Sequence, residues 1–153
     1  MKKMDSETQQ RNDIFNLTVI VDFIFEDGLL FISVKNISND PAFKVSIEFN
    51  KKIMGVSGRK EISSLPLFRN IEFLAPHKEI KTFLDTSESY FSRKQPEKIL
   101  IKISYKDKKG ELSSGTISHD LSIYREIGYI KVIEEPGYLT DGKEIQNKPG
   151  GNI

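Results

Sequence analysis

Leu29–Asn50, LLFISVKNISNDPAFKVSIEFN, is the stretch of sequence that decides the fold, because two alternating runs flank a cluster of turn-forming residues. In the second run every other residue is apolar: Phe43, Val45, Ile47 and Phe49. This period of two is typical of a β-strand with one buried face and one solvated face. The second run is therefore predicted to be a strand with these four side chains in the core.

The first run and the connection complete the pattern. Leu30, Ile32, Val34 and Asn36 share one face of the first run, and the opposite face is also partly apolar, which indicates a more central strand. The connection Ser38–Pro41 combines side chains that bond local backbone with a proline ring that fixes φ. The chain is therefore expected to reverse direction there.

Another strand with the same period precedes this stretch. Its apolar face is formed by alternate residues: Leu17, Val19, Val21, Phe23 and Phe25. Asp27 and Gly28 follow it directly, and Asp-Gly between two apolar runs is a strong signal for a two-residue hairpin turn. The two strands are therefore predicted to be antiparallel neighbours.

Downstream of Asn50, glycine and proline residues interrupt the pattern as far as Phe68. We expect a short edge strand near Ile53–Val56, followed by a loop whose apolar residues reach the core: Leu65, Leu67 and Phe68. The segments Ile71–Leu74 and Glu79–Asp85 flank a turn at Pro76, which predicts a second hairpin.

One short helix is predicted after this hairpin. Asp85 stands three residues before Glu88, a spacing that allows reciprocal capping of the first helical turn. Pro96 limits the helix to a turn or two. Its Tyr90 and Phe91 are expected to cover an open end of the strand assembly.

Two late strands close the pattern. Lys98–Lys106 has alternate apolar residues, and a turn over 107–110 follows it: the apolar set is Ile99, Ile101, Ile103 and Tyr105. A final strand from about Gly115 is expected to carry one face of Ile117, His119, Leu121 and Ile123. The segment Ile127–Ile133 is apolar enough either to prolong this strand after a break at Gly128 or to add an edge strand.

These patterns predict an all-β fold, an immunoglobulin-like sandwich of about seven or eight antiparallel strands with one short helical turn. An up-and-down barrel is the alternative, but the long irregular connection over 54–68 fits a Greek-key crossover better. We predict a disordered arm over 1–13, the sandwich over 14–133 and a flexible tail over 134–153.

The composition narrows the classes of function. The 153 residues carry 23 Lys and Arg against 22 Asp and Glu, so a net charge of +1 gives no long-range attraction for nucleic acid or an anionic membrane. The absence of cysteine excludes disulfides, thiolate zinc sites and a cysteine nucleophile. No run approaches the roughly 20 apolar residues of a membrane span, and no signal peptide is present, so the default expectation is a cytoplasmic protein.

Three segments carry a resemblance to a known family: ISVKNISNDPAFKVSIEF, LAPHKEIKTF and KILIKISYKDKKG. Together they resemble the immunoglobulin-like modules of the CARDB and NEW3 type in bacteria and archaea. In those modules a V.N.G..PA..V.V.F strand pair precedes a proline-containing turn into the next strand. Corresponding places are held here by Val34, Asn36, Pro41, Ala42, Val45, Ile47 and Phe49, and Ser38 stands where glycine is commonest. The resemblance covers roughly residues 17–124 and implies an adhesion, spacer or presentation element.

Neither histidine is predicted to be catalytic or to bind a metal. His119 stands in a Ser-His-Asp tripeptide, but neighbours in a strand point to opposite faces and cannot converge on a substrate. His77 lies in a turn, and two distant histidines without cysteine make a poor transition-metal site. The carboxylates near Asp40 and Asp107 lack the spacing of a calcium loop. We therefore assign no catalytic, cofactor-binding or metal-binding residue and no cofactor.

Two other patterns also have structural explanations. A basic strand end beside Tyr105 is formed by Lys102, Lys106, Lys108 and Lys109, and lysines at a hairpin tip usually serve solubility and block edge pairing. Asn16 and Asn36 begin Asn-x-Ser/Thr triplets, which we interpret as chance matches to the glycosylation pattern because both begin in or at strands.

Two functions are open, and neither is enzymatic. The first is a non-catalytic protein-interaction or structural module, whose protein partner binds through loops or an edge strand near Ile53–Val56 or Ile127–Ile133. The alternative is an accessory ligand-binding domain of the carbohydrate-binding kind, in which exposed Tyr124, Tyr129 and Tyr138 stack on sugars; the lack of tryptophan disfavours it. The sequence does not fix the oligomeric state.

Overall fold

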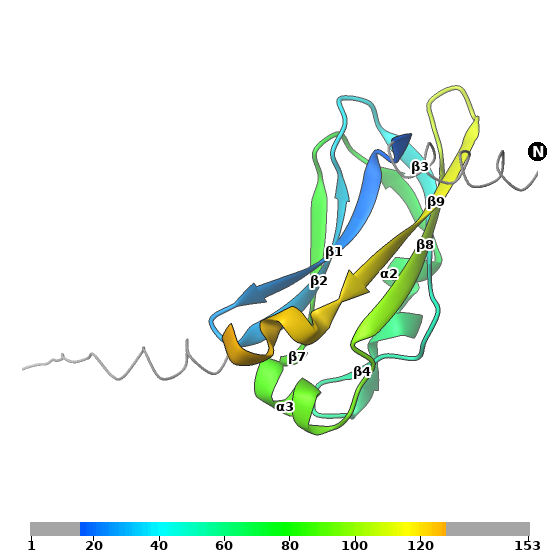
Figure 1. Ribbon diagram of the computed structural model, residues 1–153. Coiled ribbons are helices and arrows are strands. Elements are labelled where there is room, and N and C mark those ends of the chain that lie inside the picture. The colour runs from blue at the N-terminus through cyan, green and yellow to red at the C-terminus, as the bar shows by residue number, and fades with distance from the viewer. Residues whose placement is uncertain (1–15, 128–153) are drawn as a thin grey trace, which may run out of the picture.

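The computed structural model describes residues 16–127 of the chain, and within them seven of nine strands form an antiparallel β-sandwich (Figure 1). The all-β prediction is therefore confirmed. The predicted arm over 1–13, the predicted tail over 134–153 and nearly all of the segment predicted as an added strand over 127–133 lie outside the described residues.

Two sheets make up the sandwich. One has the order β1-β2-β7, with β1 (Val19–Glu26), β2 (Leu29–Asn36) and β7 (Glu79–Thr86). The other has the order β6-β3-β8-β9, with β6 (Ile71–Leu74), β3 (Ala42–Phe49), β8 (Lys98–Lys106) and β9 (Leu112–Asp120). A separate two-stranded ribbon pairs β4 (Met54–Gly55) with β5 (Lys60–Glu61).

The first hairpin and the core follow the predicted alternation. β1 and β2 are antiparallel with Glu26 opposite Leu29, and Asp27 and Gly28 both have positive φ, as a type I′ turn requires. The apolar layer between the sheets takes its side chains from alternate positions of β1, β2, β3 and β8, which include Val21, Ile32, Val45 and Ile101. These inward faces are almost completely buried.

The reversal predicted between β2 and β3 carries the chain from one sheet to the other. Asn36, the last residue of β2, is completely buried, and its side chain holds this crossing. Its Nδ2 donates to the carbonyl oxygens of Asp40 at 2.9 Å and Leu74 at 3.1 Å, and its Oδ1 accepts from the backbone N–H of Ser38 at 3.0 Å. One side chain thus links the ends of β2 and β6, which belong to opposite sheets.

The predicted inward direction of Phe43 is wrong. Lys44 has a φ of 52°, and the register between β3 and β8 shifts between Phe43 and Ser46, which marks a β-bulge. The bulge puts Ala42 on the buried face and turns Phe43 outward, where its ring meets that of Phe73 with centroids 5.5 Å apart. An unbroken alternation in sequence cannot reveal this extra residue.

The second predicted hairpin is also wrong, although its strands are where the sequence indicates. β6 pairs with β3 and β7 pairs with β2, so the turn at Pro76 crosses between sheets and does not join neighbours. Likewise, Ile53–Val56 is not an edge strand of the sandwich. Its β4 residues pair only with β5, and the N–H of Val56 donates to the carbonyl oxygen of Leu84 in β7 at 2.8 Å.

The connection after β5 contains two short helices where the sequence indicated a loop. These are η1 (Ile62–Ser64) and α2 (Pro66–Arg69), which starts with proline as first turns often do. Phe68 is buried, and Leu65 and Leu67 pack against the core as predicted.

The helix α3 (Ser87–Ser92) lies at one end of the sandwich, where Tyr90 is completely buried and Phe91 packs against the core (Figure 1). Its cap is Thr86, one residue later than predicted, because the Thr86 hydroxyl accepts from the N–H of Ser89 at 3.1 Å. The predicted cap, Asp85, has a different role.

Asp85 is a buried carboxylate that joins three segments. It forms an ion pair with Arg93 and accepts from the N–H groups of Ser57 at 3.2 Å and Thr86 at 2.9 Å. Arg93 also donates to the carbonyl oxygen of Met54 at 3.2 Å. Because each charged group has a partner, this buried pair fastens the β4–β5 ribbon and α3 to the end of β7.

β8 and its inward face match the prediction, whereas β9 differs at both ends. β9 starts at Leu112 and ends at Asp120, whose side chain accepts from the N–H of Ser122 at 3.0 Å and caps the 3₁₀ helix η2 (Leu121–Tyr124). Hydrogen bonding from the side chain of Ser122, together with that from its backbone N–H, lowers the pKa of Asp120. Ile123, predicted on the inward face of the strand, is therefore exposed.

Replacing Asn36 with alanine should destabilise the fold, because two carbonyl oxygens that its amide serves lose their donor. We expect the free energy of unfolding in urea to fall by about 2–4 kcal/mol. Ser38→Ala is the control, since Ser38 lies in the same loop but most of its contacts are exposed; it should cost less than about 1 kcal/mol. Equal losses for the two variants would contradict the role of Asn36.

Tyr90 should make stability fall at high pH. Its hydroxyl donates to the carbonyl oxygen of Pro96, and burial raises the pKa of Tyr90 well above its ordinary value of 10.0. The unfolded chain then releases this proton at a pH where the folded chain still holds it. The contribution of the protonated Tyr90 hydroxyl to the free energy of unfolding is therefore complete below about pH 10 and is lost as the pH rises further. Urea titrations at increasing alkaline pH should show a shallower decline for Tyr90→Phe than for the wild type.

Candidate functional site

The outer strands of the two sheets determine where the sandwich can bind another chain. β1 and β7 are the outer strands of one sheet, and β6 and β9 are those of the other. An outer strand carries a row of unpaired N–H and C=O groups, which another strand can use unless side chains or loops cover them. The cover on each of these four edges therefore decides which of them is available.

The edge of β1 is covered by side chains from the opposite sheet and from η2. The carbonyl oxygen of Val21 accepts from Nε2 of His119 at 2.8 Å, and that of Phe23 accepts from the hydroxyl of Tyr124 at 3.2 Å. Since a carbonyl can only accept, Nε2 of His119 carries the proton. The N–H of Phe23 is taken by the carboxylate of Asp22 at 2.9 Å.

The edges of β7 and β6 are protected in other ways. The β4–β5 ribbon covers the end of β7 at Leu84, and the remainder of that edge carries Glu79 and Lys81, which are charged. β6 has only four residues, and its Glu72 pairs with Lys44 at 2.8 Å. Charge and shortness are the usual protections of natural edge strands.

The edge of β9 is open. Two backbone hydrogen bonds flank the β8–β9 ladder and show which of its residue pairs are hydrogen-bonded. The N–H of Asp107 donates to the carbonyl oxygen of Glu111 at 2.9 Å, and the N–H of Leu121 donates to the carbonyl oxygen of Glu97 at 2.8 Å. Bonded pairs alternate in an antiparallel ladder. The residues whose N–H and C=O groups point away from β8 are therefore Leu112, Ser114, Thr116 and Ser118. Within residues 16–127 these outward groups have no hydrogen-bond partner.

The side chains of β9 also lack the usual protections. The strand reads LSSGTISHD, without proline, lysine, arginine or glutamate, and its one carboxylate, Asp120, is the last residue. Most of its side chains are serine, threonine or glycine. An approaching strand therefore meets little steric or electrostatic obstruction along nine residues.

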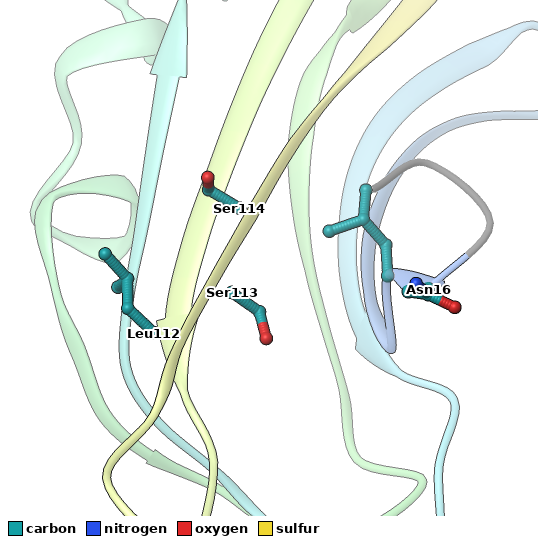
Figure 2. A pocket seen from close by; sticks show the side chains of 5 residues that line it. Asn16, Leu112, Ser113 and Ser114 are labelled. Atoms are coloured by element: carbon teal, nitrogen blue, oxygen red, sulfur yellow. The ribbon is translucent and has the colours of Figure 1, made fainter. Parts of the chain in front are cut away.

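A hollow of about 210 Å³ opens beside the first residues of β9, and it is lined by Asn16, Leu17, Leu112, Ser113 and Ser114. Figure 2 shows Leu112 and Ser113 on opposite sides of the strand, with Asn16 across the hollow. Gly115 leaves room for Leu17 here, because a Cβ at this glycine would lie 3.0 Å from Leu17 Cδ1. The hollow is the place where an inward side chain of an added strand can fit.

The residues predicted to form a basic strand end, Tyr105 and the lysines beside it, do not form one exposed cluster in the structure. Tyr105 is buried, and its hydroxyl accepts from the N–H of Thr18 at 2.8 Å, so it does not lie beside exposed lysines. Lys108 pairs with Asp40 at 3.1 Å. Asp107 accepts from two backbone N–H groups of its own turn. Both carboxylates that we considered for calcium are thus engaged, and no group of three potential metal ligands occurs within residues 16–127.

The two histidines have separate partners. Nε2 of His77 lies 2.7 Å from Oδ1 of Asn39 in an exposed turn, whereas His119 covers the edge of β1 and packs edge-on against Phe23. Asn36 is completely buried, which excludes a glycan there in the folded protein.

Of the three tyrosines expected for sugar binding, Tyr124 lies within the described residues. Tyr124 is half-buried and stacks on Phe25 with ring centroids 5.8 Å apart, and its hydroxyl is bonded to β1. Burial raises the pKa of Tyr124. Tyr129 and Tyr138 lie outside the described residues.

Comparison with protein families gives one match. The model of the family described as "Domain of unknown function (DUF8453)" matches residues 2–125. The chain belongs to the DUF8453 family. This match contains every strand of the sandwich, including the open β9. The comparison with curated proteins finds no match for this DUF8453 chain. Among the helices of residues 16–127, none has the length and apolar character needed to cross a membrane.

The sequence did not identify β9 as the open edge of this DUF8453 domain. The feature that could have indicated this edge is the lack of protective residues: the nine-residue run has no proline and no charged residue before its last position. Assigning that run to an edge also requires the strand order, which alternation does not provide.

Replacing His119 with phenylalanine should weaken the cover of β1, since the ring can still pack on Phe23 but cannot donate to Val21. We expect a loss of about 1 kcal/mol in the free energy of unfolding, measured in urea. His77→Asn is the control, because asparagine tolerates the positive φ of that turn; it should change stability by less than about 0.5 kcal/mol. A His119→Phe variant as stable as the wild type would contradict the bond's contribution.

Proposed function

We propose that this DUF8453 chain is a non-catalytic protein-interaction module that takes up an extended segment of protein as an additional strand on the edge of β9. The open row of N–H and C=O groups on β9 carries the proposal. The other three edges of the described sandwich are covered, short or charged, whereas β9 combines nine residues and free backbone groups with side chains that are uncharged up to its last residue.

Strand addition matches the chemistry of this edge. Main-chain hydrogen bonds supply affinity in such complexes, and pockets for alternate side chains supply specificity. The outward N–H and C=O groups of Ser114 and Thr116 lie at the centre of the edge, and the hollow at Leu17 and Ser113 can take one inward side chain. No covalent step is required, since the edge offers only hydrogen bonds and contact area.

We also infer that the sandwich is immunoglobulin-like and related to the CARDB and NEW3 modules. Apart from the β4–β5 ribbon, its first, second and fifth strands form one sheet, and its third, sixth and seventh lie in the other, as in immunoglobulin domains. The fourth strand, β6, joins the second sheet. The contacts of Asn36 give a physical reason for an asparagine at this place of the motif. Such modules commonly act as adhesion or spacer elements.

Peptide selection on the folded protein tests the proposed function. The N–H of Thr116 points away from β8, so Thr116→Pro removes a donor from the edge without removing a β8–β9 bond, whereas Thr116→Ala keeps that donor. We expect peptides selected from a random extended library to bind the wild type and Thr116→Ala similarly, and Thr116→Pro at least about tenfold more weakly.

The site of binding should also be visible. Amide signals of β9 should shift when a selected peptide binds, and those of β7 should not. For a monomeric wild type, a library that yields no binder, or binders insensitive to Thr116→Pro, would overturn the proposed function. Urea unfolding of Thr116→Pro checks that the variant is folded.

A further inference from the structure

We propose that the segment taken up by β9 is β9 of a second copy of this chain. The two strands pair antiparallel about a twofold axis at Thr116, and the two four-stranded sheets become one continuous eight-stranded sheet. This inference rests on the proposed function, because it names the occupant of the same edge.

The register of β9 allows this pairing along its whole length. An axis at Thr116 places Thr116 of one copy opposite Thr116 of the other. Ser114 then lies opposite Ser118 of the second copy, and Leu112 lies opposite its Asp120. Leu112, Ser114, Thr116 and Ser118 occupy the same phase of the ladder, with their N–H and C=O groups directed away from β8. Each outward donor therefore meets an outward acceptor, as a hydrogen-bonded antiparallel pair requires.

The inward side chains are complementary in size. The same register sets Ile117 opposite Gly115 and His119 opposite Ser113 of the second copy, so a large side chain meets a small one in each of these pairs. These are the pairs whose side chains approach most closely in an antiparallel ladder. Ile117 of the second copy then stands beside Leu17, which already fills the space over Gly115, and extends the apolar layer.

The charges along the edge permit a second copy, because the pairing places no like charges in adjacent positions. The one charged residue of β9, Asp120, would lie opposite Leu112 of the second copy, and Lys106 is the next residue in that row. The row across the interface is then Lys98, Asp120, Leu112 and Lys106, so Asp120 keeps its neighbour Lys98 and meets an uncharged residue of the second copy. The Lys102 residues of the two copies are three strand spacings apart, about 14 Å, which exceeds the screening length of about 8 Å in physiological salt.

The outward face adds a favourable central pair. Thr116 would face Thr116 of the second copy, and threonine pairs across antiparallel strands are favourable. Symmetric pairing of one patch with itself is also the commonest interface in homo-oligomers. Register, side-chain size and charge are therefore all consistent with the same axis.

Sedimentation of the full chain tests whether it self-associates through β9. We expect the wild type and Thr116→Ala to form dimers and Thr116→Pro to dissociate at a concentration at least about tenfold higher. Dimers that persist unchanged in a folded Thr116→Pro variant, or a wild type that stays monomeric throughout the concentration range, would overturn the inference.

Cross-linking tests the axis itself, and the absence of cysteine from the chain makes each introduced thiol unique. Thr116→Cys should be linked to itself by a short bis-maleimide, because the opposed Cα atoms lie about 5.5 Å apart. Ser104→Cys, on the same face of β8, should not be linked. Ser114→Cys and Ser118→Cys should be linked when mixed and much less when alone. Equal linking at Thr116 and Ser104 would contradict the axis.

The two proposals fail differently. A monomer that still binds selected peptides through β9 would retain the proposed function and exclude the second copy as occupant. A monomer that binds no peptide would exclude both.

Discussion

The sandwich depends on the crossing between its two sheets at the end of β2, and the buried amide of Asn36 holds that crossing. The amide donates to carbonyl oxygens of the connection and of β6, so one side chain positions strands that share no ladder. With this crossing fixed, the alternating residues of β2 and β3 face each other and form a common apolar layer. The other crossings place the remaining strands over the same layer.

Alternation in the sequence predicted the strands well but did not predict their partners. β6 and β8 have the bounds that the pattern gave, because one buried face leaves a clear period of two. A hairpin and a crossing between sheets both need a turn, so the turn at Pro76 could not distinguish them. Local backbone geometry was also hidden: the bulge at Lys44 reversed Phe43, and the cap moved from Asp85 to Thr86.

The candidate site was harder to predict because an edge is a property of the strand order. β1 and β9 both read as ordinary strands, yet His119 and Tyr124 cover β1 from about a hundred positions further along the chain. These side chains act on backbone groups, which the sequence of β1 does not mark. The exposure of β9 follows from the same arrangement, since the strand that supplies His119 to β1 receives no comparable cover on its own outer side within the described residues.

The cover of β1 has a consequence for how the domain can be divided. Tyr124 is the last residue to close that edge, and the family match ends one residue later, at position 125. A fragment cut within η2 keeps every strand of the sandwich but exposes unpaired backbone groups on the edge of β1, so that both sheets have an open edge strand. Such a fragment is prone to aggregate, so a recombinant fragment that resists aggregation has to extend through η2.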